Sequence, residues 1–132
     1  MTTPADPPGQ AADPAEQAKA VIEYCYDQGW TDGLPVVPAT RSGVEAFLAT
    51  TPRGADEIIG TAPHLGRSIT VAQAAANAIM AGCQPEYFPL VLAAWDAVNL
   101  ERSARGAWQS TSGPSPLIVV NGPARSRLGI NC

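Results

Sequence analysis

The stretch Gly29-Trp30-Thr31-Asp32-Gly33-Leu34-Pro35 decides how the first part of this 132-residue chain is organised. A helical pattern over residues 15–28 precedes it, and Gly29 suits the left-handed backbone position that ends a helix. Two prolines and a glycine within residues 30–40 exclude a helix there and predict a turn followed by an extended segment. We therefore expect a braced loop that presents an indole, a hydroxyl and a carboxylate within a few residues.

Three further helices are predicted beyond this loop. The clearest start is Thr70, because Gln73 three residues later completes a capping box and Val71 begins an apolar run. Pro85 suits the first position of the next helix. The helix from Thr70 is small or apolar on nearly every side, which predicts that little of it faces water. Counting the helix before the loop, the patterns cover residues 15–28, 42–49, 70–82 and 85–99.

The strands are predicted mainly in the last third of the chain. Residues 117–120 form a short apolar run between turn residues, which is typical of a strand covered on both faces, and residues 107–111 are a second candidate. Residues 53–68 are predicted to be irregular, apart from a short strand or turn at 57–59. The expected fold is α/β, or alternatively mixed α+β, with about four helices, a central buried Ala-rich αα-hairpin and a small C-terminal sheet.

Composition favours one domain with a covered face. Residues 1–14 are rich in proline and predict a disordered arm, which leaves residues 15–132 as a single domain. Charged residues make up 15% of the chain and apolar residues 45%, whereas soluble domains average about 25% charged. A surface so poor in charge predicts a face that a partner covers.

Charge and cysteine content exclude several function classes. The net charge is −4, and the basic last quarter holds too few arginines for a nucleic-acid footprint. Cys25, Cys83 and Cys132 are widely spaced and His64 is the sole histidine, so neither a disulfide framework nor a standard zinc site is expected. We find no signal peptide and no membrane-spanning run, which predicts a cytoplasmic protein. No phosphate- or dinucleotide-binding glycine motif is present either, so the sequence does not indicate which cofactor, if any, the protein uses.

The loop supplies the first candidate site residues. Trp30, Thr31 and Gly33 are candidate substrate contacts, and the Asp32 carboxylate is a candidate for proton transfer. The alternative is structural: Trp30 would fill the core beside the preceding helix and Asp32 would cap a turn.

The helical hairpin supplies a second group. Cys83 lies before a helix N-terminus, where backbone donors favour a thiolate, so it is a candidate nucleophile; inert packing is the alternative. Asn77 is predicted to be buried, where an unpaired amide would cost about 1–3 kcal/mol, so it must bond either a neighbouring backbone or a substrate beside Cys83. Tyr87 is a further candidate contact.

Asn121 and Gly122 form the third group. They follow the predicted strand 117–120, and strand ends in α/β folds commonly open onto ligand crevices. Turn formation alone would also explain them.

Three runs resemble a poorly characterised bacterial family associated with UGSC-motif selenoproteins and related thiol proteins. They are GWTDGLPVVPAT (29–40), NAIMAGCQPEYFPLVLAA (77–94) and LIVVNGPARSRLGIN (117–131), and the resemblance covers about residues 20–131. Members of that family continue past the last run with a glycine-rich segment, whereas this chain stops at Cys132. The resemblance therefore implies a second polypeptide that supplies the missing half, or a truncated or processed product.

These observations lead to two hypotheses of function. The first is the small subunit of a two-part bacterial enzyme that acts on a small molecule at a shared interface, where Cys83 or Cys132 offers thiol chemistry and Asp32 a carboxylate. A lyase, hydratase or sulfur-transfer reaction would suit these groups. The alternative is a non-catalytic stabilising subunit or a homo-oligomeric small-molecule-binding protein.

Overall fold

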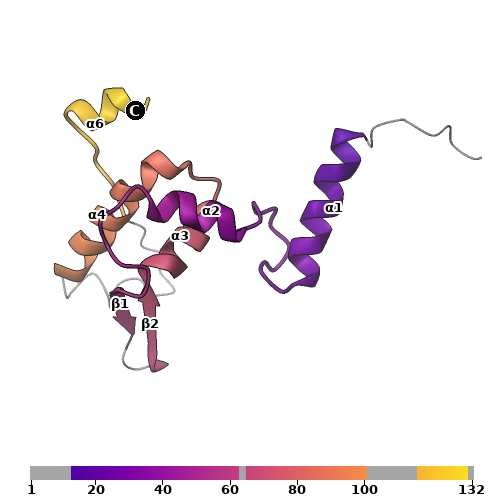
Figure 1. Ribbon diagram of the computed structural model, residues 1–132, viewed down its shortest axis with the longest axis horizontal. Helices are drawn as coiled ribbons and strands as arrows, with labels where there is room; N and C mark the ends of the chain where they lie inside the picture. The colour runs from indigo at the N-terminus through magenta and orange to yellow at the C-terminus, as the bar shows by residue number, and fades with distance from the viewer. Residues whose placement is uncertain (1–12, 63–64, 101–115, 131–132) are drawn as a thin grey trace, which may run out of the picture. The chain divides into compact units, whose positions relative to one another are not determined.

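The computed structural model describes residues 13–62, 65–100 and 116–130. The chain divides into two compact units, Met1–Pro38 and Ala39–Cys132 (Figure 1). The predicted arm, residues 1–14, lies outside the described residues except for its last two. The single domain expected over residues 15–132 stays a prediction.

The first unit consists of helix α1 (Pro14–Asp27) and the loop that follows it. The Asp13 side chain accepts a hydrogen bond from the Ala15 backbone at 3.1 Å, and Pro14 occupies the first turn, where it has no intrahelical donor to lose. The helix ends at Gly29, whose φ of 68° lies in the left-handed region. The helix predicted over residues 15–28 is confirmed.

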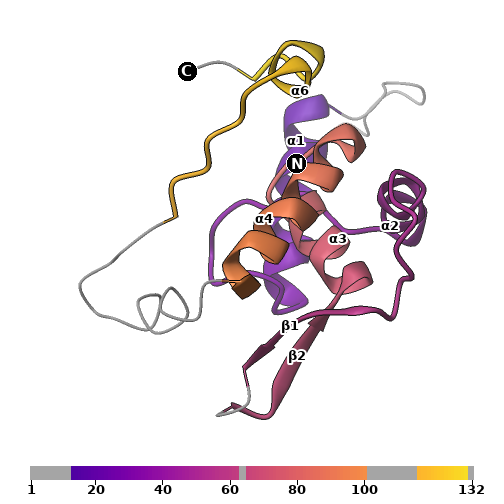
Figure 2. The same cartoon turned by 90° about the vertical axis from the view of Figure 1, so that its left-hand side faces the viewer.

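The second unit holds the remaining described elements, and three more of the predicted helices are confirmed there. Helices α2, α3 and α4 gather at one end of a β-hairpin in both views (Figure 1, Figure 2). A short helix, α6, was not predicted. In chain order the elements are α2 (Arg41–Leu48), β1 (Ile58–Ala62), β2 (Arg67–Thr70), α3 (Val71–Met80), the 3-10 turn η2 (Pro85–Tyr87), α4 (Phe88–Leu100) and α6 (Pro123–Arg127).

Helix α3 begins with the predicted capping box. The Gln73 backbone N–H donates to Thr70 Oγ1 at 3.3 Å, and the Thr70 backbone N–H donates to Gln73 Oε1 at 2.9 Å. Two backbone N–H groups at the helix start are thus satisfied by side chains within one turn.

The sheet lies in the middle of the chain, so its predicted position was wrong. Strands β1 and β2 pair antiparallel as a two-stranded sheet within residues 58–70. The run 117–120 is not a strand, and three of its side chains, Leu117, Ile118 and Val119, are 88%, 63% and 74% exposed. An apolar run becomes a strand only where another backbone segment pairs with it, and that pairing is not local. The candidate strand 107–111 lies outside the described residues.

A β-bulge in β1 turns two consecutive residues toward the core. Ile58 pairs with Thr70 and Gly60 with Ile69, so that Ile59 is the extra residue on its strand. Ile59 and Gly60 are both buried, which breaks the alternation of inward and outward side chains that marks a strand in sequence.

The core of the second unit is built mainly by α3. This helix supplies five of the nine clustered buried residues, and the Phe47 and Phe88 rings meet across the core with their centroids 5.6 Å apart. Little of α3 faces water, as predicted, because eight of its ten residues are buried or half-buried and only Gln73 and Asn77 are exposed. The nine core residues are Phe47, Ile59, Val71, Ala74, Ala75, Ala78, Ile79, Phe88 and Leu92.

Three charged side chains connect the segment before the hairpin to α4. Arg53 pairs with Glu57 at 2.7 Å and with Asp96 at 2.9 Å. The hydrogen bonds that the Arg53 guanidinium donates to Glu57 and then to Asp96 raise its pKa. None of the helices in the described ranges combines the length and apolar character that a membrane span requires.

Candidate functional site

The loop after α1 is held at both ends by Cys25. The Cys25 carbonyl accepts the Trp30 backbone N–H at 3.1 Å, and the Gly29 N–H bonds the Tyr26 carbonyl at 2.9 Å, which together form a Schellman motif. Further along the loop, the buried Cys25 thiol donates to the Val36 carbonyl at 3.9 Å. Cys25 therefore fixes where the loop leaves the helix and where it returns.

Thr31 closes a tight turn inside this loop. Its hydroxyl donates to the Leu34 carbonyl at 2.7 Å and accepts the Gly33 backbone N–H at 3.3 Å. One side chain thus satisfies two backbone groups, a common device for stabilising a turn. The candidate residue Thr31 has a structural role here, and its hydroxyl is already engaged on both sides.

Neither of the structural alternatives holds for Trp30 and Asp32: Trp30 does not fill a core, and Asp32 does not cap a turn. Trp30 is 41% exposed and packs edge-on against Tyr24, with ring centroids 5.7 Å apart, so it does not fill a core. Asp32 is exposed and its carboxylate forms no hydrogen bond or ion pair within the described residues. The turn cap expected of Asp32 is supplied by Thr31.

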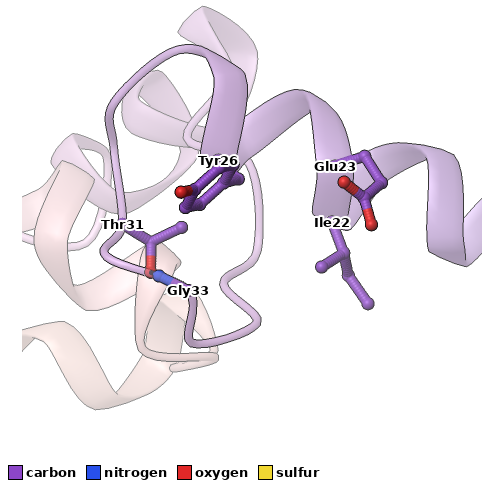
Figure 3. A pocket seen from close by; sticks show the side chains of 5 residues that line it. All are labelled: Ile22, Glu23, Tyr26, Thr31 and Gly33. Atoms are coloured by element: carbon purple, nitrogen blue, oxygen red, sulfur yellow. Dashed lines mark hydrogen bonds between the residues drawn. The ribbon is translucent and has the colours of Figure 1, made fainter.

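A half-open pocket of about 240 Å³ lies between α1 and this turn. Figure 3 shows Tyr26 beside Thr31 and Gly33, with Ile22 and Glu23 on the preceding turn of the helix. All five lining residues belong to the first unit. The pocket combines one carboxylate, one phenol and one aliphatic side chain, and its volume lies just below the range of about 300–1,000 Å³ that is usual for small-molecule sites.

Cys83 and Asn77 are both accounted for by the architecture of α3. The Cys83 backbone N–H donates to the Ala78 carbonyl at 2.9 Å as part of the helix C-cap, and its half-buried side chain packs against the core. Asn77 is exposed rather than buried, and its amide donates to the Gln73 carbonyl one turn earlier at 2.8 Å. Asn77 thus uses the backbone partner that was the alternative to a substrate.

The remaining candidates lie around α6. The half-buried Tyr87 hydroxyl donates to the Leu128 carbonyl at 3.4 Å, which connects η2 to the end of α6. Gly122 is the N-cap residue of α6 and Asn121 precedes it, exposed. Residues 117–120 do not form a strand, so Asn121 and Gly122 do not follow a strand end as predicted.

The candidate residues therefore fall into separate groups. Trp30, Thr31, Asp32 and Gly33 lie in the first unit, whereas Asn77, Cys83, Tyr87, Asn121 and Gly122 lie in the second. Cys132 and His64 are outside the described residues. Within the ranges that are described, no group of three or more His, Cys, Asp or Glu side chains is arranged to hold a metal ion.

Sequence reasoning found one side of the pocket and missed the other. Thr31 and Gly33 were candidates, but Ile22, Glu23 and Tyr26 were not, because the pattern of α1 indicated only a helix with one buried face. The available signal was helical spacing: Ile22 and Tyr26 are four residues apart and Glu23 lies between them, so all three share one side of the last turns of α1.

Comparison with protein-family models, with curated proteins and with solved structures finds no match to this chain.

Proposed function

We propose that this chain is the smaller subunit of a two-part enzyme and supplies one wall of a small-molecule site, formed by the end of α1 and the loop 30–34. The observation that carries the proposal is the half-open pocket beside a braced turn, in which the exposed Asp32 lies between two lining residues in sequence, Thr31 and Gly33. A rigid loop that leaves acidic groups unpaired is suited to binding and proton transfer.

Exposed apolar side chains around the loop support a second subunit. Trp30, Leu34 and Val37 lie within eight residues of sequence and are 41%, 71% and 49% exposed, and large apolar patches on a surface mark sites that another protein covers. We propose that the partner covers these residues and completes the open side of the pocket. Lyase and hydratase reactions are the classes that the carboxylate groups of this wall would serve; a sulfur-transfer reaction would need a thiol that the lining residues do not supply.

A non-catalytic stabilising subunit is the second candidate, and the second unit favours it. Cys83 and Asn77 are both engaged in helix and core contacts of their own. Their positions therefore need no substrate to explain them.

Purification of the tagged full chain from its host, with size-exclusion chromatography and light scattering, tests the assembly. We expect a stoichiometric second polypeptide, and we expect Leu34→Asp to remove it. Leu65→Asp is the matched control, because Leu65 is 61% exposed on the hairpin, away from the loop in sequence. If the chain purifies as a stable particle of one polypeptide, or if Leu34→Asp retains the partner as well as Leu65→Asp does, the proposal fails.

Asp32→Asn and Cys83→Ser then separate the two candidate functions. Each variant is compared with the unaltered assembly in the reaction that the co-purified complex performs. If both variants assemble and turn over substrate at the unaltered rate, the chain is the non-catalytic subunit.

A further inference from the structure

We propose that the pocket between α1 and the loop binds a small organic cation with N–H donors, such as a primary ammonium group. This inference rests on the proposed function, since it names the ligand class of the same site. It follows from which polar groups of the pocket are engaged and which are free.

The hydrogen-bond donors of the pocket floor are already used. The Thr31 hydroxyl donates to the Leu34 carbonyl at 2.7 Å, and the Gly33 N–H donates to Thr31 Oγ1 at 3.3 Å. Among the groups that line the pocket, a carboxylate or phosphate would find only the Tyr26 hydroxyl as a free donor, because the donors of Thr31 and Gly33 are released only if this turn breaks. The floor therefore disfavours anions.

The acceptors of the pocket are free. Within the described residues, neither the Glu23 carboxylate nor the Tyr26 hydroxyl forms a side-chain hydrogen bond or ion pair, and Lys19, one turn before Glu23, does not pair with it. An ionised carboxylate only accepts hydrogen bonds. A ligand that bonds the Glu23 carboxylate must therefore bring donors, and a positive charge on the ligand strengthens those hydrogen bonds.

Charge and shape favour the same class of ligand. Residues 13–38 carry five acidic side chains and one lysine, so their combined field attracts cations. The Tyr26 ring, 55% exposed at the pocket wall, offers an aromatic face to a cation, and Ile22 offers apolar surface to an alkyl chain. A metal ion is a poorer fit, because no cluster of three potential ligand side chains lies in the described ranges.

Binding is tested on the ¹⁵N-labelled full chain by titration with butylammonium chloride, with sodium butyrate and butan-1-ol as matched probes of the same chain length. We expect butylammonium to shift the amide resonances of Thr31 and Gly33, and the two other probes to shift them less. Glu23→Gln should weaken butylammonium binding by roughly twofold to fivefold, the range for loss of an exposed ion pair. Glu16→Gln is the control, since Glu16 is an exposed acid on the same helix that does not line the pocket.

Three results would overturn the inference: butan-1-ol binds as tightly as butylammonium, Glu23→Gln behaves like Glu16→Gln, or no probe shifts the loop amides. All five lining residues belong to this chain, so the titration does not depend on a partner. An assembly that forms while butylammonium leaves the loop amides unshifted would refute the ligand class alone. Butylammonium binding without any assembly would refute the two-part function alone.

Discussion

Replacing Gly60 with alanine probes how tightly the hairpin packs against Trp95 of α4. A Cβ atom at this position would lie 3.0 Å from Cζ3 and 3.3 Å from Cε3 of the Trp95 indole, and 2.9 Å from Cγ2 of Ile69. Non-bonded carbon atoms rest about 3.5–4.0 Å apart, so the ring and the methyl group must retreat by roughly 0.5–1 Å.

The surroundings of Trp95 resist this movement. The indole is rigid, and two residues that follow it in α4 attach the helix to the hairpin and the segment before it: Asp96 pairs with Arg53 at 2.9 Å, and the Asn99 amide donates to the Ile59 carbonyl in the bulge. Overpacking a core of this kind costs about 1–3 kcal/mol. We therefore expect Gly60→Ala to lower the melting temperature by roughly 4–12 °C, at about 4 °C per kcal/mol for a chain of this size.

Urea unfolding followed by far-UV circular dichroism measures the cost. Gly54→Ala is the matched control, because an added Cβ there meets no atom within 4 Å and the residue has an ordinary φ. We expect that control to be neutral or more stable by about 0.4–1 kcal/mol, since alanine restricts the unfolded chain. In a Trp95→Leu background, Gly60→Ala should cost less than it does in the unaltered protein.

Two outcomes would refute this reasoning. The first is equal stability of Gly60→Ala and Gly54→Ala. The second is an unchanged cost of Gly60→Ala when Trp95 is replaced by leucine, which would show that the ring is not what the new methyl group meets.

Three further predictions concern single residues. Thr70→Ala removes the side-chain acceptor at the start of α3 and should lower the free energy of unfolding by about 1 kcal/mol in urea titrations; an unchanged midpoint would contradict the role of the capping box. Arg53→Met should lower the free energy of unfolding by about 0.2–1 kcal/mol for each of the two exposed ion pairs, with Glu57 and Asp96. Its neighbours raise the pKa of the guanidinium. The ion pairs therefore contribute fully to the free energy of unfolding below the ordinary arginine pKa, and this contribution is lost only as pH rises through the raised pKa. The cost should therefore be equal at about pH 6 and about pH 9, and a difference between them would refute the assignment. Cys25, with 0% exposure, should react with iodoacetamide more slowly than the half-buried Cys83; peptide mass spectrometry checks this, and equal labelling rates would show that the loop does not stay closed over Cys25.

The candidate site was only partly predictable, because one wall is a local turn and the other depends on the path that the chain takes after α1. Thr31 and Gly33 lie in a turn whose composition is visible in six consecutive residues. The opposite wall depends on the direction in which the Schellman turn returns the chain along α1, which places Glu23 and Tyr26 opposite Thr31. The residue types in this segment do not predict the direction in which the chain runs after the turn.

The four main helices were determined by the sequence itself, because their signals are local. The capping box at Thr70 and Gln73, the glycine after α1 and the periodic apolar positions all act within one or two turns. Local interactions of this kind are the same whatever the rest of the chain does.

The sheet was decided only by the tertiary structure. The run 117–120 has the stronger strand composition, yet the strands form at 58–62 and 67–70, where a short connection brings two segments together and α4 covers the bulge. A strand requires a hydrogen-bonding partner, and a bulge such as that at Ile59 turns neighbouring side chains to the same face only when the core beside it has room. Strand pairing and core packing join residues that are distant in sequence, so no single stretch of the sequence determines them.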